Sequence, residues 1–107
     1  MPKYLFRSTY TTDGVRGLLD EGGTGRAKES ERFLASLGGR LESFHFGFGG
    51  TDTYIVADLP DNAAAAAVCL TAAASGSVGS ETVVLLTPEE IDEAVHQKVG
   101  FRPPGAR

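Results

Sequence analysis

The sequence lacks several features by which small proteins are stabilised or attached to membranes. Its 107 residues contain one cysteine, Cys69, so an intramolecular disulfide is impossible, and we expect a buried thiol in a reducing compartment. The longest apolar run, residues 63–70, is too short to cross a bilayer, and no apolar leader opens the chain. These absences predict a soluble, cytoplasmic protein that does not contact a membrane.

Concentrated positive charge and clustered metal ligands are also missing. The net charge is −4 and the ten basic residues are scattered, which argues against nucleic acid as a partner. The two histidines, His45 and His96, have no second ligand at a metal-binding spacing, so we expect no metal and no other cofactor. The glycine-rich residues 22–26 match no phosphate-binding motif, and a break in a helix is the simpler interpretation.

The strongest pattern that is present is a pair of alternating apolar runs in residues 41–59, LESFHFGFGGTDTYIVADL. Three phenylalanines recur at every second position of the first run, and a Gly-Gly-Thr-Asp turn separates the two runs. This spacing predicts a β-hairpin in the centre of the fold. A first strand is predicted over residues 4–10, and a fourth strand, apolar on both faces, over residues 80–87.

Helical patterns fill the segments between these strands. Thr12 is expected to cap a first helix that breaks at the glycines and resumes at Arg26. Asp61 is expected to cap an alanine-rich helix that ends at Gly76. A Thr-Pro-Glu-Glu capping box then predicts a short last helix that runs through Val95.

The element order is therefore β-α-β-β-α-β with one added helix, in a single domain of residues 1–107. This order predicts an α+β protein with a ferredoxin-like, four-stranded antiparallel sheet. Two helices can cover only one face of that sheet, and strands that are apolar on both faces need a second cover. We expect that cover to be the same face of a second copy, which gives a homodimeric two-chain barrel.

The chain ends in a tail, residues 100–107, in which Phe101 and Arg102 precede two prolines. Prolines reduce the entropy that an extended segment loses when it becomes ordered, and the aromatic ring can bury a substantial apolar area. We therefore expect the tail to be extended and to dock on its own domain or on a partner chain.

One histidine is placed where acid or base chemistry is feasible. His45 alternates with phenylalanines, so it should point away from their face of the sheet. If the phenylalanines pack under the helices, Arg7, Thr9 and Thr53 can project into the same space as His45. Histidine titrates near neutral pH, and arginine can hold an oxyanion. The alternative is a histidine that is hydrogen-bonded at a dimer interface.

The hairpin turn holds a second candidate pair. Asp52 and Tyr54 are two residues apart and are expected to share one face, which would place a carboxylate beside a phenol at the mouth of the barrel. Such a pair suits ligand binding. Asp52 equally suits a structural role, because aspartate after Gly-Gly often caps its own turn.

Longer stretches carry a characteristic set of motifs: RSTYTTDGVRGLLDEGGTGR, SLGGRLESFHFGFGGTD, YIVADLPDNAAAAAV, TPEEID and FRPPG. Together they resemble the GYD-domain family over nearly the whole chain. That family is named after a Gly-Tyr-Asp triplet in its β-hairpin, which here is Gly50-Thr51-Asp52. The resemblance implies a dimeric α+β barrel, and it implies no particular reaction because the biochemical role of the family is uncharacterised.

Two functional hypotheses follow. The first is an oligomeric module that binds a small molecule or serves as an interaction domain. The alternative is a cofactor-independent enzyme of the monooxygenase or isomerase type, with His45 and Arg7 in a pocket between two sheets. The first is favoured, because neither a nucleophile with its base nor a set of metal ligands accompanies the histidine.

Overall fold

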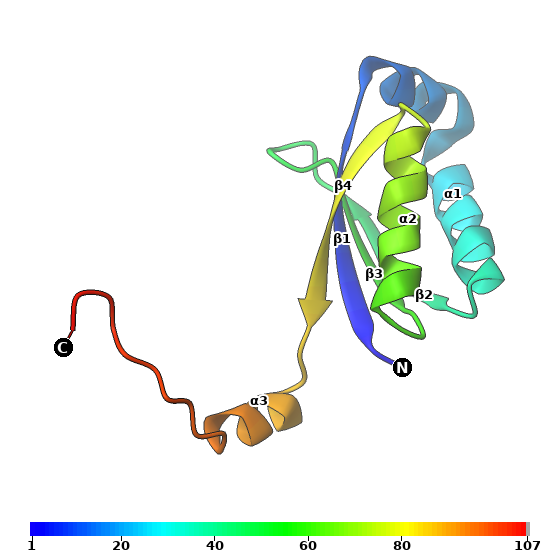
Figure 1. The fold of residues 1–107 in the computed structure, drawn as a ribbon. Coiled ribbons are helices and arrows are strands. Elements are labelled where there is room, and N and C mark those ends of the chain that lie inside the picture. Colours follow the sequence, from blue (N-terminus) through cyan, green and yellow to red (C-terminus); the bar gives the residue numbers. More distant parts are fainter. Residues whose placement is uncertain (107) are drawn as a thin grey trace.

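The computed structural model describes residues 1–106 as one four-stranded antiparallel sheet, with two helices on one face and a third helix set apart (Figure 1). Along the chain the elements are β1 (Lys3–Tyr10), α1 (Thr12–Ser36), β2 (Arg40–Phe46), β3 (Thr53–Asp58), α2 (Asn62–Ala74), β4 (Val78–Leu85) and α3 (Pro88–Val95). The strand order β2-β3-β1-β4 places β1 and β3 in the middle of the sheet. The predicted α+β class and ferredoxin-like order are confirmed.

Alternation along the central strands builds the core between the sheet and the two helices. Every second residue of β1 and β3 points toward α1 and α2, because successive side chains of a strand leave on opposite faces. The fully buried apolar side chains all belong to this layer: Tyr4, Phe6, Leu34, Ala57, Leu59 and Ala65. This core occupies only one side of the sheet, so the other side, here called the open face, is left without a helical layer (Figure 1).

The first helix is capped by Thr11, and the prediction of Thr12 is corrected by one residue. The Thr11 hydroxyl accepts a hydrogen bond from the amide three residues later, at 3.2 Å, while Thr12 is already helical. The helix breaks at a single glycine, Gly22, whose φ of 79° lies in the left-handed region that glycine tolerates. Helical geometry therefore resumes at Gly23 and not at Arg26.

The fourth strand begins at Val78, two residues earlier than predicted, and ends at Leu85. Its first residues, Val78 and Gly79, pair with the last two residues of β1. The glycine interrupts the apolar pattern, which is why periodicity alone placed the start at Ser80.

The hairpin strands are shorter than the apolar pattern that predicted them. β2 ends at Phe46 and β3 begins at Thr53, so Phe48 lies in the turn with a φ of 56°. Its ring is stacked on that of Phe46, with 5.7 Å between the ring centres. The third phenylalanine of the periodic run thus belongs to the turn.

The second helix begins as predicted, because Asp61 accepts a hydrogen bond from the amide of Ala64 at 2.9 Å. Its partly buried Cys69 lies 2.6 Å from the hydroxyl oxygen of Thr82 and so links α2 to β4. Within residues 1–106, no helix combines the length and the apolar character needed to cross a bilayer.

The predicted capping box of α3 is confirmed: Thr87 and Glu90 exchange hydrogen bonds of 3.0 and 3.1 Å between side chains and backbone amides. This helix and the tail extend away from the sheet (Figure 1). Two residues separate β4 from α3, and the helix does not fold back over the sheet (Figure 1). The apolar side chains of this arm, residues 86–106, are exposed: Leu86, Ile91, Val95, Val99 and Phe101.

The expectation that the tail docks on its own domain is therefore wrong for the residues that the structure describes. Phe101 is 72% exposed, and Arg102 donates a hydrogen bond to the carbonyl of Ala106 at 2.6 Å. Docking on a partner chain stays a prediction.

Candidate functional site

A row of four polar or aromatic residues crosses the open face at one level. The strand register pairs His45 with Tyr54, Tyr54 with Arg7, and Arg7 with Glu81. Paired residues of neighbouring strands lie on the same face of the sheet. The structure thus brings together three of the predicted residues, His45, Arg7 and Tyr54, and adds Glu81, which sequence reasoning did not select.

The geometry of this row limits what His45 and Arg7 can do together. Two strand spacings separate them, so their backbones are about 10 Å apart. Tyr54 lies between them and is 41% exposed. Arg7 Nη2 also lies 3.5 Å from Glu81 Oε2 in an exposed ion pair. A single small oxyanion is therefore poorly placed to contact both His45 and Arg7, whereas a larger ligand or a protein surface can span the row.

Beside this row lies a shallow cavity of about 300 Å³. Arg7, Thr9 and Glu81 line it from β1 and β4, and Gly50 and Thr51 line it from the hairpin turn. Thr9, which was predicted to bind a ligand, is among the residues that line this cavity, and its binding role stays a prediction. Thr51, the middle residue of the turn triplet, reaches the same cavity only through the fold of the hairpin, and no sequence pattern indicated this.

Asp52 ties the hairpin to the end of β1. Its Oδ2 accepts a hydrogen bond from the backbone N–H of Tyr10 at 2.8 Å, and its own N–H donates to the carbonyl of Ser8 at 2.8 Å. The carboxylate therefore holds the neighbouring strand and not its own turn. One oxygen is occupied in this way, and the role of Asp52 in ligand binding stays a prediction.

Thr53 lies on the opposite face from the rest of the predicted set. It pairs with Ser8 on the helix-covered side and is only 1% exposed, because its neighbour Tyr54 takes the open face. The expectation that Thr53 projects into the same space as His45 and Arg7 is therefore wrong.

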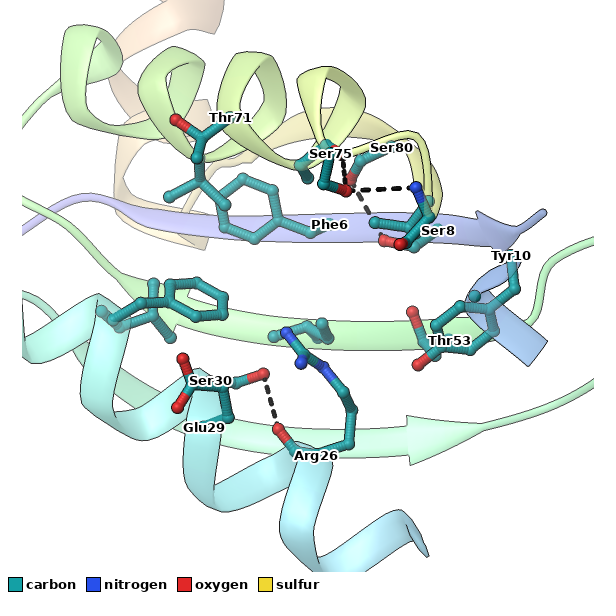
Figure 2. Close-up of a pocket in the computed structure, with 18 of the residues that line it drawn as sticks. Phe6, Ser8, Tyr10, Arg26, Glu29, Ser30, Thr53, Thr71, Ser75 and Ser80 are labelled. Atoms are coloured by element: carbon teal, nitrogen blue, oxygen red, sulfur yellow. Dashed lines mark hydrogen bonds between the residues drawn. The ribbon is translucent and has the colours of Figure 1, made fainter. Parts of the chain in front are cut away.

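A larger cavity of about 560 Å³ lies on that helix-covered side, between the sheet and the helices α1 and α2 (Figure 2). Thr53 lines it together with Ser8, Ser80, Tyr10 and Arg26. Burial raises the pKa of the Tyr10 phenol above its ordinary value, so this group stays protonated at neutral pH. Sequence reasoning missed this cavity. The available signal was the presence of hydroxyl residues at strand positions that face the core.

A cluster of charged side chains lies at the other end of the open face. Asp58 Oδ1 accepts a hydrogen bond from Lys3 Nζ at 2.8 Å, and its Oδ2 accepts one from Arg40 Nη2 at 3.1 Å. Lys3 also bonds Glu42 at 2.8 Å. The hydrogen bond from Lys3, with a smaller contribution from Arg40, lowers the pKa of Asp58. Both carboxylate oxygens are engaged, so the cluster serves as a structural tie.

No three histidine, cysteine, aspartate or glutamate side chains among residues 1–106 are grouped so that they could share a metal ion.

Comparison with known proteins gives one match. A family model described as GYD domain matches residues 4–95, which extend from β1 to the end of α3. Neither the curated proteins nor the solved structures contain a match to this chain.

Proposed function

The chain belongs to the GYD domain family, and from this premise we propose that it acts as a homodimeric binding module in which two sheets pack through their open faces. One observation carries the proposal: nothing from residues 1–106 covers this face, although apolar side chains line its centre. Leu5 pairs with Val56 on one side and with Val83 on the other, in a row parallel to the His45–Glu81 row.

The arrangement of side chains on the open face supports a second copy as the occupant. The apolar row lies between the polar row and the Asp58 cluster, which resembles the apolar centre and polar rim of protein interfaces. A twofold axis through the centre places the same surface of each chain against the other. A stable dimer of this kind buries more than about 1,000 Å² in total.

The dimer also completes the shallow cavity near the hairpin turn. In one chain the hollow beside Arg7 and Thr9 is open to solvent, and ligand pockets usually enclose most of the bound molecule. The sheet of the partner would form the missing wall. The open face thus supports both parts of the proposed function, self-association and the binding of a small molecule.

A cofactor-independent enzyme is the second candidate, favoured by the presence of His45 and Arg7 in one row. Against it stand the distance between the two residues and the ion pair between Arg7 and Glu81. In this candidate His45 exchanges a proton with a substrate long enough to reach the Arg7 guanidinium.

We expect Val83→Asp to convert the dimer to a monomer, because it places a charge in the apolar row that the dimer would bury. Light scattering and sedimentation at micromolar concentration measure the mass. Leu70→Asp is the matched control, since Leu70 is an exposed apolar residue of α2 that is 71% accessible. A wild-type protein that is monomeric at these concentrations contradicts the proposal.

We expect deletion of residues 100–107 to weaken the dimer by about tenfold, because Phe101 can bury an area of about 150 Å² against the partner. The dissociation constant is measured by sedimentation, and Phe101→Ala separates the effect of the ring from that of the backbone. An unchanged dissociation constant together with an unchanged melting temperature shows that the tail takes no part in the interface.

A further inference from the structure

The helix-side cavity is separate from the open face and does not depend on the proposed dimer. Its volume of about 560 Å³ lies within the range of small-molecule sites, roughly 300–1,000 Å³. Figure 2 shows that its lining comes from the sheet on one side and from α1 and α2 on the other. It therefore has the size of a small-molecule pocket, with one side open to solvent.

The floor of this cavity carries a row of three hydroxyls on neighbouring strands. The register pairs Ser8 with Thr53 on β3 and with Ser80 on β4. The oxygens of Ser8 and Ser80 lie 3.1 Å apart and satisfy each other. Thr53 Oγ1 is buried and has no hydrogen-bond partner among the described residues 1–106.

An unpaired hydroxyl in this position needs an explanation. Buried polar side chains are hydrogen-bonded in the large majority of cases, because an unpaired buried group is unfavourable. Valine has nearly the same shape as threonine and would remove the unpaired group. A ligand oxygen that reaches this atom would supply the missing partner of Thr53.

Apolar side chains on both sides of the cavity leave room for a ring, next to further hydroxyl residues such as Ser30 and Thr71. Phe6 and Ile55 from the sheet face Phe33 from α1 and Val68 from α2 across the cavity. Alanines of α2 also line it, including Ala67 and Ala72, and their short side chains leave the space between helix and sheet unfilled. The cavity thus offers apolar contacts for a ring beside the row of hydroxyls.

The charges at its rim are already paired with each other. Arg26 Nη1 lies 3.6 Å from Glu21 Oε2, and Arg32 forms an ion pair with Glu29 one turn further along α1. Among the described residues 1–106, both cations at the rim already have a carboxylate partner, and an anion buried against the hydroxyls would lack a counterion. The row of hydroxyls suits a neutral oxygen.

We propose that this cavity binds a neutral aromatic molecule with one hydroxyl or carbonyl oxygen, and that this oxygen is hydrogen-bonded to Thr53 Oγ1. The ring lies among Phe6, Phe33 and Ile55. The hydroxyl of a phenol can both donate to and accept from Thr53, so a simple phenol is the smallest molecule that meets these requirements.

Three probes of nearly equal shape test the proposal in the full chain: p-cresol, toluene and p-toluate. Amide chemical shifts in ¹⁵N-labelled protein report where each probe binds and how tightly. We expect p-cresol to shift the amides that line the cavity, toluene to bind about five- to tenfold more weakly, and p-toluate to bind more weakly still.

Thr53→Val is expected to weaken p-cresol binding by about tenfold and to leave toluene binding unchanged. Thr24→Val is the control, since Thr24 is an exposed threonine of α1 that does not line the cavity. Ala72→Leu, which fills the space from α2, is expected to abolish binding of all three probes.

The proposal is overturned if p-cresol binds no better than toluene, if p-toluate binds best, or if Thr53→Val leaves p-cresol binding intact. The monomeric variant Val83→Asp separates the two sites, because it should bind p-cresol with the same affinity as the wild type. Failure of the dimer hypothesis therefore leaves this test unaffected.

Discussion

Gly14→Ala should lower the free energy of unfolding by about 2–4 kcal/mol, since the added methyl group has no room. An ideal Cβ at Gly14 would lie 2.0 Å from the carbonyl oxygen of Ser77 and 2.9 Å from Cδ1 of Tyr10. The Ser77 oxygen cannot retreat easily, because it accepts a hydrogen bond from the Thr11 amide at 3.0 Å. The first turn of α1 and the start of β4 would have to separate.

Urea unfolding at a fixed protein concentration measures this effect, since the proposed self-association would make the stability depend on concentration. Gly17→Ala is the control in the same helix: nothing lies within 4 Å of its Cβ position. Alanine has a higher helix propensity than glycine, so Gly17→Ala should raise the free energy of unfolding by about 0.5–1 kcal/mol. Equal effects of the two substitutions would show that the contact between Gly14 and Ser77 does not limit packing.

Asp58→Asn is the second substitution with a large expected effect, a loss of about 1.5–3 kcal/mol at neutral pH. The side chain of Asp58 is only 10% exposed and accepts charged hydrogen bonds from Lys3 and Arg40. Asparagine keeps the shape but turns one acceptor into a donor that faces two cations. Glu42→Gln, at the exposed partner of Lys3, should cost at most about 1 kcal/mol.

The effect of Asp58 should depend on pH in a definite direction. Its pKa is lower in the folded chain than the ordinary value of 3.8, so the folded state binds this proton less readily than the unfolded state. The stabilisation is complete above the unfolded pKa and is lost as the pH falls through the folded pKa. The difference in unfolding free energy between wild type and Asp58→Asn should therefore shrink below pH 4 or so. A difference that is constant down to pH 2 or so would contradict the role of Asp58 as a charged partner.

The parts of the fold that local chemistry determines were predictable from the sequence. The Thr87–Glu90 capping box, the Asp61 cap and the order of the elements along the chain all follow from residues close together in the sequence. The direction of α3 was not predictable in this way. It depends on the backbone angles of the two-residue link after β4, and no periodic pattern in the sequence reports these angles.

The candidate site was predictable only where one strand determines it. The alternation of His45 with phenylalanines predicts that it lies on the open face. The prediction for Thr53 was wrong because Thr53 is adjacent to Tyr54 in β3, and adjacent residues of a strand face opposite sides of the sheet. The helix-side cavity was beyond reach for another reason. The alanines of α2 do not by themselves show whether the helix packs against the sheet or leaves a space, and in the structure Ala67 and Ala72 line an unfilled space.

Because side chains alternate along β1 and β3, these two strands form part of both faces of the sheet. Arg7 and Ser8 are adjacent in β1, as are Thr53 and Tyr54 in β3, yet the members of each pair face opposite sides of the sheet. A molecule that displaces these strands from the helix side necessarily changes the shape of the open face. By thermodynamic linkage, any factor by which such a ligand alters self-association is the same factor by which self-association alters the affinity for the ligand.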